Sequence, residues 1–166
     1  MGIMFKPVLI DQIKAGNKRM TRRILKPDLF LFDNCIKAWI PNKSNPTTTR
    51  VVYKVGNTYA VQPGRGKLGV GRVIITVLRI EALGDITAAD ARLEGFTDEY
   101  AFSSYWNRLY NSWRPQTQVI VIGFDYLVIN GEIDGVPVLR PMDYDNLTSK
   151  IDRLEIADLR YQESFK

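Results

Sequence analysis

The sequence contains no histidine and a single cysteine, which limits the chemistry that its side chains can perform. Ser-His-Asp catalysis, Cys-His catalysis and histidine-ligated zinc are all excluded. A hydroxyl nucleophile in this chain therefore needs a lysine or a carboxylate as its base. A lysine can serve only where burial or neighbouring cations lower its pKa. Arg19, Arg22 and Arg23 supply such cations close to Lys18.

Basic residues also suggest the kind of ligand. The chain has 23 Lys and Arg residues against 18 Asp and Glu residues, a net charge of +5 that favours polyanionic partners. The glycine-rich turn at residues 63–67 leaves backbone amides free to bind an oxygen atom, and Tyr59 could stack on a base. The candidate nucleic-acid-binding residues are Arg19, Arg22, Arg23, Arg65, Lys67, Arg72 and Tyr59.

Length and composition are typical of one globular domain with a tail, at 166 residues of which 45% are hydrophobic. We expect a domain over residues 1–130 with an insertion at about 26–53, and an extension over residues 131–166 with a helix at about 147–160. The single Cys35 fits a reducing compartment, and no apolar run approaches the roughly 20 residues that span a bilayer. A cytoplasmic protein without membrane contacts, cofactor or metal is expected.

Hydrophobic periodicity and capping residues predict the elements. Helices are expected at residues 7–16, at 87–95 with Thr87 as N-cap, and at 98–110 with Thr97 as N-cap. Strands are expected at residues 19–25, 36–40, 51–54, 58–62, 70–80 and 119–129, with a loop at 41–49. The strands at 70–80 and 119–129 carry apolar residues on both faces, which is typical of central strands.

Three segments, in the same order along the chain, resemble the motifs of the ASCH family of the PUA-like superfamily. Residues 16–23 (GNKRMTRR) are similar to its G-x-K-x-x-T-x-R signature, residues 55–62 (VGNTYAVQ) to its G-D-x-L-x-V strand, and residues 83–95 (LGDITAADARLEG) to its L-x-D-I-x-x-x-D-A-x-x-E-G helix. Asn57 replaces the usual Asp, and Gln62 stands where many phage-encoded members have Arg. The likeness is greatest to phage-type members, and this resemblance implies a host cytoplasm if the protein is phage-encoded.

This resemblance implies an α+β fold, a PUA-like barrel of about five to seven strands with two to four flanking helices and a cleft lined by the motifs. ASCH members are generally regarded as RNA-binding. One branch consists of amidohydrolases that remove acyl groups from N4-acetylcytidine nucleosides with a Lys, a Thr and a Glu. The corresponding positions here are Lys18, Thr21 and Glu94, the proposed catalytic residues.

In the implied mechanism, Lys18 deprotonates Thr21, Thr21 attacks the acyl carbon, and Glu94 passes protons to the leaving amine. If Lys18 and Thr21 lay on one regular strand, they would face opposite sides. They can converge only if Lys18 remains in the turn after Gly16.

Three functions remain open at this point. The first is a module that binds RNA, a nucleotide or a modified nucleoside, and the second is a hydrolase on a modified nucleoside or on RNA, since related ASCH proteins have also been considered ribonucleases. The third is a non-catalytic phage accessory protein that binds a host protein through the helix at residues 147–160.

Overall fold

The computed structural model describes residues 2–32, 36–133 and 136–141. Its strands are β1 (Gly2–Met4), β2 (Met20–Ile24), β3 (Phe30–Phe32), β4 (Lys37–Asn42), β5 (Asn45–Lys54), β6 (Thr58–Gln62), β7 (Arg72–Ala82), β8 (Gln118–Ile133) and β9 (Val136–Pro141). Its helices are α1 (Pro7–Lys14), the short 3₁₀-helix η1 (Leu83–Asp85), α2 (Ala88–Leu93) and α3 (Glu99–Tyr110).

The chain divides into two units, Met1–Tyr126 and Leu127–Lys166. In the second unit, β9 pairs antiparallel with the end of β8, from Leu127 opposite Pro141 to Ile133 opposite Val136. The helix expected at residues 147–160 lies outside the described residues.

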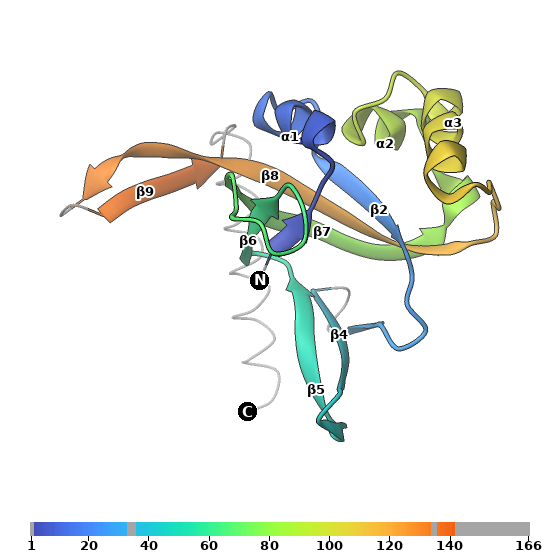
Figure 1. The fold of residues 1–166 in the computed structure, drawn as a ribbon, viewed down its shortest axis with the longest axis horizontal. Helices are drawn as coiled ribbons and strands as arrows, with labels where there is room; N and C mark the ends of the chain where they lie inside the picture. Colours follow the sequence, from blue (N-terminus) through green and yellow to red (C-terminus); the bar gives the residue numbers. More distant parts are fainter. Residues whose placement is uncertain (1, 33–35, 134–135, 142–166) are drawn as a thin grey trace, which may run out of the picture. The chain divides into compact units, whose positions relative to one another are not determined.

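The first unit contains one sheet with the strand order β1-β6-β7-β8-β2 and a second sheet with the order β3-β4-β5 (Figure 1). β1 runs parallel to β6, and β2 runs antiparallel to β8. The α+β class is confirmed, with the expected two to four helices; the described residues form nine strands in two sheets, where about five to seven strands were expected. β1 and β2 stand at the two ends of the pairing order, so the pairings of the described strands do not close this sheet into a barrel.

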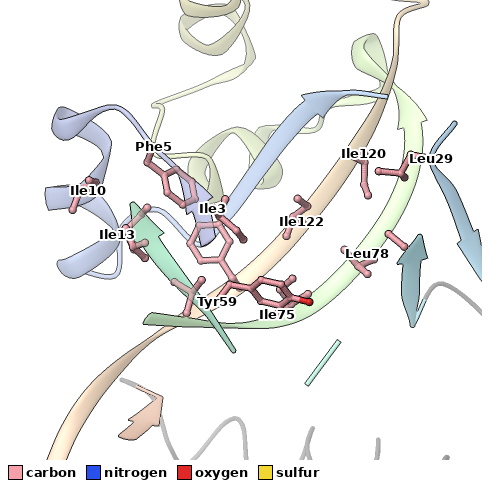
Figure 2. Packing of buried hydrophobic residues seen from close by; sticks show 14 of the residues in the cluster. Ile3, Phe5, Ile10, Ile13, Leu29, Tyr59, Ile75, Leu78, Ile120 and Ile122 are labelled. Carbon is pink, nitrogen blue, oxygen red and sulfur yellow. The ribbon is translucent and has the colours of Figure 1, made fainter. Parts of the chain in front are cut away.

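The core forms because β8 buries apolar side chains on both of its faces, as the sequence predicts. Ile120 and Ile122 join a cluster with α1, β1 and β7, whereas Val119 and Val121 join a second cluster with α2 and α3. Figure 2 shows the first cluster, in which α1 contributes Ile10 and Ile13, residues that its amphipathic pattern places on one side. β7 is less enclosed, because Val77 and Ile80 on it are both 36% exposed.

Two local predictions were wrong. The N-cap of α3 is Asp98, whose Oδ1 accepts a hydrogen bond from the amide of Ala101 at 2.8 Å, and not Thr97. A carboxylate at the N-cap also interacts favourably with the helix dipole. The loop expected at residues 41–49 is mostly strand, because β4 and β5 continue to a turn at Lys43 and Ser44. The β-branched threonines at residues 47–49 suit that strand.

Candidate active site

Lys18 lies in the segment that joins α1 to β2, before the strand begins at Met20. Two backbone hydrogen bonds hold this segment against its neighbours: the amide of Lys18 donates to the carbonyl of Gln12 at 3.1 Å, and that of Arg19 donates to the carbonyl of Leu93 at 2.7 Å. The second bond closes the C-terminal end of α2 and brings Lys18 beside Glu94. Because Lys18 is not on β2, the alternation of that strand does not separate it from Thr21.

Lys18 and Glu94 form a buried ion pair, although 76 residues separate them in the sequence. The Lys18 Nζ atom lies 2.7 Å from Glu94 Oε2 and 2.8 Å from the carbonyl oxygen of Glu94. The two residues are 2% and 3% exposed. Burial lowers the pKa of Lys18 below its ordinary value of 10.5; Glu94 opposes this shift, while Arg23 and Arg22 add to it. Lys18 therefore loses its proton more readily than a surface lysine does.

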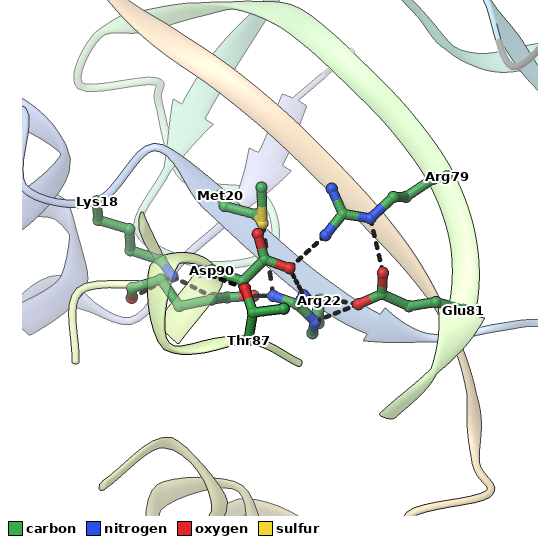
Figure 3. A network of polar contacts seen from close by, with 8 residues as sticks. Lys18, Met20, Arg22, Arg79, Glu81, Thr87 and Asp90 are labelled. Atoms are coloured by element: carbon green, nitrogen blue, oxygen red, sulfur yellow. Dashed lines mark hydrogen bonds and ion pairs between the residues drawn. The ribbon is translucent and has the colours of Figure 1, made fainter. Parts of the chain in front are cut away.

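Arg22 connects Glu94 to two further carboxylates, as Figure 3 shows. Its Nη1 atom lies 3.4 Å from Glu94 Oε1, and its Nη2 atom lies 2.6 Å from Glu81 Oε1 and 2.5 Å from Asp90 Oδ2. The Arg22 side chain is 0% exposed. Because this buried guanidinium is already bound by three carboxylates, the structure favours a positioning role for Arg22 at Glu94, and its contact with nucleic acid stays a prediction.

Arg79, a partly exposed residue of β7, extends this network. Its Nε atom donates to Glu81 Oε2 at 2.6 Å, and its Nη2 atom donates to Asp90. Lys18, Arg22 and Arg79 thus face Glu81, Asp90 and Glu94, so that three cations balance three carboxylates. Such compensation is required for charges that are removed from water.

The catalytic candidates meet at one cavity of about 180 Å³, which is lined by Lys18, Thr21 and Glu94 together with Arg22 and Arg23. Its remaining walls are mainly apolar and aromatic: Met4, Phe5, Leu9, Phe96, Phe102, Tyr105, Trp106, Leu109 and Tyr110, with Lys6 beside them. The Lys6 Nζ atom lies 5.9 Å from the centre of the Tyr105 ring. The structure therefore combines a buried polar group with a wall that suits a flat ring.

Arg19 and Arg23, the two arginines on either side of Arg22 in the sequence segment 19–23, differ in their surroundings. Arg23 lines the cavity, donates from Nη2 to the carbonyl of Met4 at 2.6 Å, and lies 5.8 Å from the centre of the Phe5 ring. Its Nε atom is buried without a hydrogen-bond partner. Arg19 is not among the lining residues; its Nε atom donates to the carbonyl of Gly16, and its Nη1 atom lies 3.8 Å from Asp125 Oδ1.

The basic residues around the glycine-rich turn at residues 63–67 form a second cluster, which lies apart from the cavity. Arg65, Lys67 and Arg72 are exposed, and none of them lines the cavity. Arg72 donates to the hydroxyl of Thr58 at 2.7 Å. Their contact with phosphates remains a prediction about a separate surface.

Tyr59 is buried and does not line the cavity, so its predicted stacking role is corrected. It is 5% exposed and belongs to the first core cluster. Its hydroxyl oxygen accepts a hydrogen bond from the amide of Lys54 at 2.8 Å. A ring enclosed in this way leaves no face for a base.

The sequence reading did not identify Arg79, Glu81 or Asp90 as parts of the site. The signal was present, because Arg79 and Glu81 are two positions apart on one strand and so share a face. Asp90 lies three residues after the N-cap Thr87, a position typical of a residue that only caps a helix. Its amide does donate to Thr87 Oγ1 at 3.1 Å, but its side chain binds the two arginines.

Gly95 ends α2 next to Glu94 and has a φ of +88°, which disfavours any side chain. A Cβ atom there would lie 2.2 Å from Gln12 Oε1. We expect Gly95→Ala to lower the free energy of unfolding by more than the roughly 1–2 kcal/mol of the backbone strain alone. Gly66→Ala is the matched control, because Gly66 has a φ of +73° with no atom within 4 Å of the added Cβ. Equal losses in urea unfolding would show that the Gln12 contact costs nothing.

Neither a membrane-spanning helix nor a metal site is present in the part of the chain that the structure describes. None of its helices is long and apolar enough to cross a bilayer. No group of three or more Cys, Asp or Glu side chains there is placed to hold a metal ion. The carboxylates around Arg22 form ion pairs with Lys18, Arg22 and Arg79.

No family model matches the chain, and no curated protein matches it. Among solved structures, it is similar to a protein of Enterococcus faecalis V583 from the family DUF984, with a TM-score of 0.46 and 14% identity over 72% of this chain and 69% of that one. It is also similar to an ASCH domain from Lactobacillus crispatus JV V101, with a TM-score of 0.45 and 17% identity over 72% of this chain and 70% of that one. An ASCH domain is thus among the structures to which this fold is similar.

Proposed function

We propose that the cavity binds the base of a modified nucleoside, free or within RNA, and hydrolyses an acyl group from its exocyclic nitrogen. The observation that carries this proposal is the meeting of Lys18, Thr21 and Glu94 at one aromatic-walled cavity. A base, a hydroxyl and a carboxylate are the groups that acyl transfer requires when no histidine is available.

The walls and the size of the cavity favour a single ring as the ligand. A volume of about 180 Å³ is below the range of about 300–1,000 Å³ that holds drug-sized ligands. Phe96 and Tyr105 offer aromatic faces on which a base can stack. The sugar and any phosphate then lie towards solvent, where Lys6 and Arg23 supply positive charge.

The contacts of Lys18 allow it to act as a base after it loses one proton. The Nζ atom has two acceptors, both on Glu94. Once the ammonium of the resting ion pair gives up a proton, its two remaining N–H groups still satisfy these acceptors, and its lone pair can accept the proton of Thr21. Burial, which lowers the pKa of Lys18, makes this loss of a proton easier.

The proposed reaction proceeds in two acyl-transfer steps. The Thr21 hydroxyl loses its proton to Lys18 and attacks the amide carbon; the C–N bond then breaks, and the amine leaves with a proton passed through Lys18 and Glu94. Water next attacks the Thr21 ester and loses a proton to Lys18, which releases the carboxylic acid and restores the hydroxyl. The unpartnered Nε donor of Arg23 is available to an oxygen of the ligand.

Incubation of the protein with N4-acetylcytidine, alone and within an oligonucleotide, tests this function when cytidine release is measured by chromatography. We expect release by the wild type and a loss of about 100-fold or more in Thr21→Val, because valine keeps the shape but lacks the nucleophile. Thr21→Ser should retain activity. Thr49→Val, a change at an exposed threonine of β5, is the matched control.

Absence of cytidine release from both substrates contradicts the proposal. Unchanged release by Thr21→Val contradicts the role of the hydroxyl. Binding of the acylated nucleoside without turnover supports instead the module that only binds nucleotides.

A further inference from the structure

The cavity is lined by more positive charge than its buried network balances. Glu94 is the one carboxylate among the lining residues, and Lys18 and Arg22 already bind it. Lys6 and Arg23 line the cavity as well, and neither forms an ion pair within the described parts of the chain. These two cations therefore have no counter-charge among the described residues.

Lys6 and Arg23 belong to one edge of the cavity, although they come from different elements. Lys6 directly precedes α1 and is exposed. Arg23, a partly exposed residue of β2, donates to the carbonyl of Met4 at 2.6 Å and lies 5.8 Å from the centre of the Phe5 ring. It is thus held against the two residues that precede Lys6. Two cations brought to one segment repel each other unless an anion lies between them.

Both side chains have donors that a ligand can use. The Nε atom of Arg23 is buried without a hydrogen-bond partner, and a buried donor without an acceptor is costly. The Lys6 Nζ atom lies 5.9 Å from the centre of the Tyr105 ring, which lines the cavity from α3. The first turn of α1 contains no acidic residue, so the positive end of its dipole adds to the same potential. An anion at this edge of the cavity satisfies all three features.

We propose that the ligand of the cavity carries a phosphate group, which Lys6 and Arg23 bind while the base lies against the aromatic wall. This inference rests on the proposed function, because that function makes the ligand a nucleoside derivative. A neutral nucleoside leaves both cations without a counter-charge. The substrate class is therefore a phosphorylated one, either a free nucleotide or a residue of RNA, since both supply the same phosphate oxygens for Lys and Arg.

A phosphate contact of this kind affects binding more than the chemical step. The sugar and the base separate the phosphate from the amide that reacts, so its contacts are the same in the ground state and in the transition state. Such uniform binding lowers KM and leaves kcat unchanged. N4-Acetylcytidine 5′-monophosphate should therefore differ from N4-acetylcytidine in KM.

Isothermal titration calorimetry with cytidine, cytidine 5′-monophosphate and the trinucleotide UpCpU tests the contact without turnover, because these ligands carry no acyl group. At low salt the monophosphate should bind about 10- to 150-fold more tightly than cytidine, the range for one charge-assisted hydrogen bond. Tighter binding of UpCpU than of the monophosphate identifies RNA as the source of the phosphate, and the reverse order identifies a free nucleotide. Added salt should weaken the binding of both phosphorylated ligands but not that of cytidine.

Lys6→Gln should reduce the preference for the monophosphate by about fivefold, because an exposed cation contributes less than a partly buried one. Lys14→Gln is the matched control, since Lys14 is an exposed lysine of α1 that does not line the cavity. Arg23→Gln should remove most of the preference that remains in Lys6→Gln. Thermal unfolding verifies that each variant is folded.

Equal affinities of the wild type for cytidine and for both phosphorylated ligands overturn the inference, and so does an equal preference in Lys6→Gln and Lys14→Gln. Failure here and failure of the proposed reaction are distinguishable. Release of cytidine with the same KM for acylated nucleoside and nucleotide supports the reaction and overturns the phosphate contact. Phosphate-dependent binding without any release of cytidine contradicts the reaction and supports the contact.

Discussion

Arg22→Met should lower the free energy of unfolding by about 3–5 kcal/mol, the usual cost of breaking a buried charge network by removal of one partner. The Arg22 side chain is fully buried, and its guanidinium contacts Glu81, Asp90 and Glu94. Methionine fills similar space but leaves these carboxylates with too few cations. Urea unfolding of the purified variant measures the loss.

Arg79→Met is the matched control for this change, because Arg79 binds Glu81 and Asp90 from a side chain that is 35% exposed. Solvent can replace a partly exposed cation, so we expect a loss of about 1 kcal/mol or less. Losses of equal size in the two variants would mean that burial of Arg22 does not determine its contribution. Arg22→Lys should restore only part of the stability, since one ammonium cannot reproduce the fork geometry of a guanidinium.

Lys18→Met should lower kcat/KM for release of cytidine by about 100- to 10,000-fold, the range that a general base contributes. The remaining activity should also lose its dependence on pH. In the wild type, the reactive form of Lys18 is the neutral amine, so kcat/KM should rise with pH and then level off. The midpoint of this rise should lie below the ordinary lysine pKa of 10.5. A profile that is flat in this range, or identical in Lys18→Met, contradicts the role of Lys18 as base.

The same residue predicts how stability depends on pH. The folded state disfavours the protonated form of Lys18, so between its folded pKa and 10.5 the unfolded chain binds more protons. The contribution of Lys18 to the free energy of unfolding therefore rises as the pH increases through this window. Lys18→Met should lack this rise. Lys14→Met, which changes an exposed lysine of α1, should keep it.

The sequence predicted the elements from which Lys18, Thr21 and Glu94 reach the cavity, while their catalytic role stays a prediction. Pro7 and Gly16 predicted the ends of α1 and so placed Lys18 just after that helix. The N-cap Thr87 predicted the start of α2 and so placed Glu94 near its end. The requirement that Lys18 remain outside the strand is met, because β2 begins at Met20. The absence of histidine and the single cysteine limit the chemistry of the site but say nothing about where its residues lie.

Other features depend on contacts between distant segments, which a single sequence does not reveal. A run of arginines on a strand usually indicates a solvated edge, yet Arg22 is buried because β7 and α2 bring Glu81 and Asp90 to it. Tyr59 has an aromatic side chain that could stack on a base, but its position opposite Val73 places it inside the core. In both cases, long-range packing decided the environment of the side chain.

The end of α2 is closed by the same residues that carry the proposed chemistry. The amide of Arg19 and the amine of Lys18 bind its last carbonyl groups, those of Leu93 and Glu94. α2 has only 6 residues, and a helix this short is not stable in water by itself. If α2 unwinds locally, Lys18 and Glu94 separate while the sheet stays folded. The proposed reaction then depends on one short helical turn, and local unwinding of that turn would stop it at a far smaller energetic cost than global unfolding.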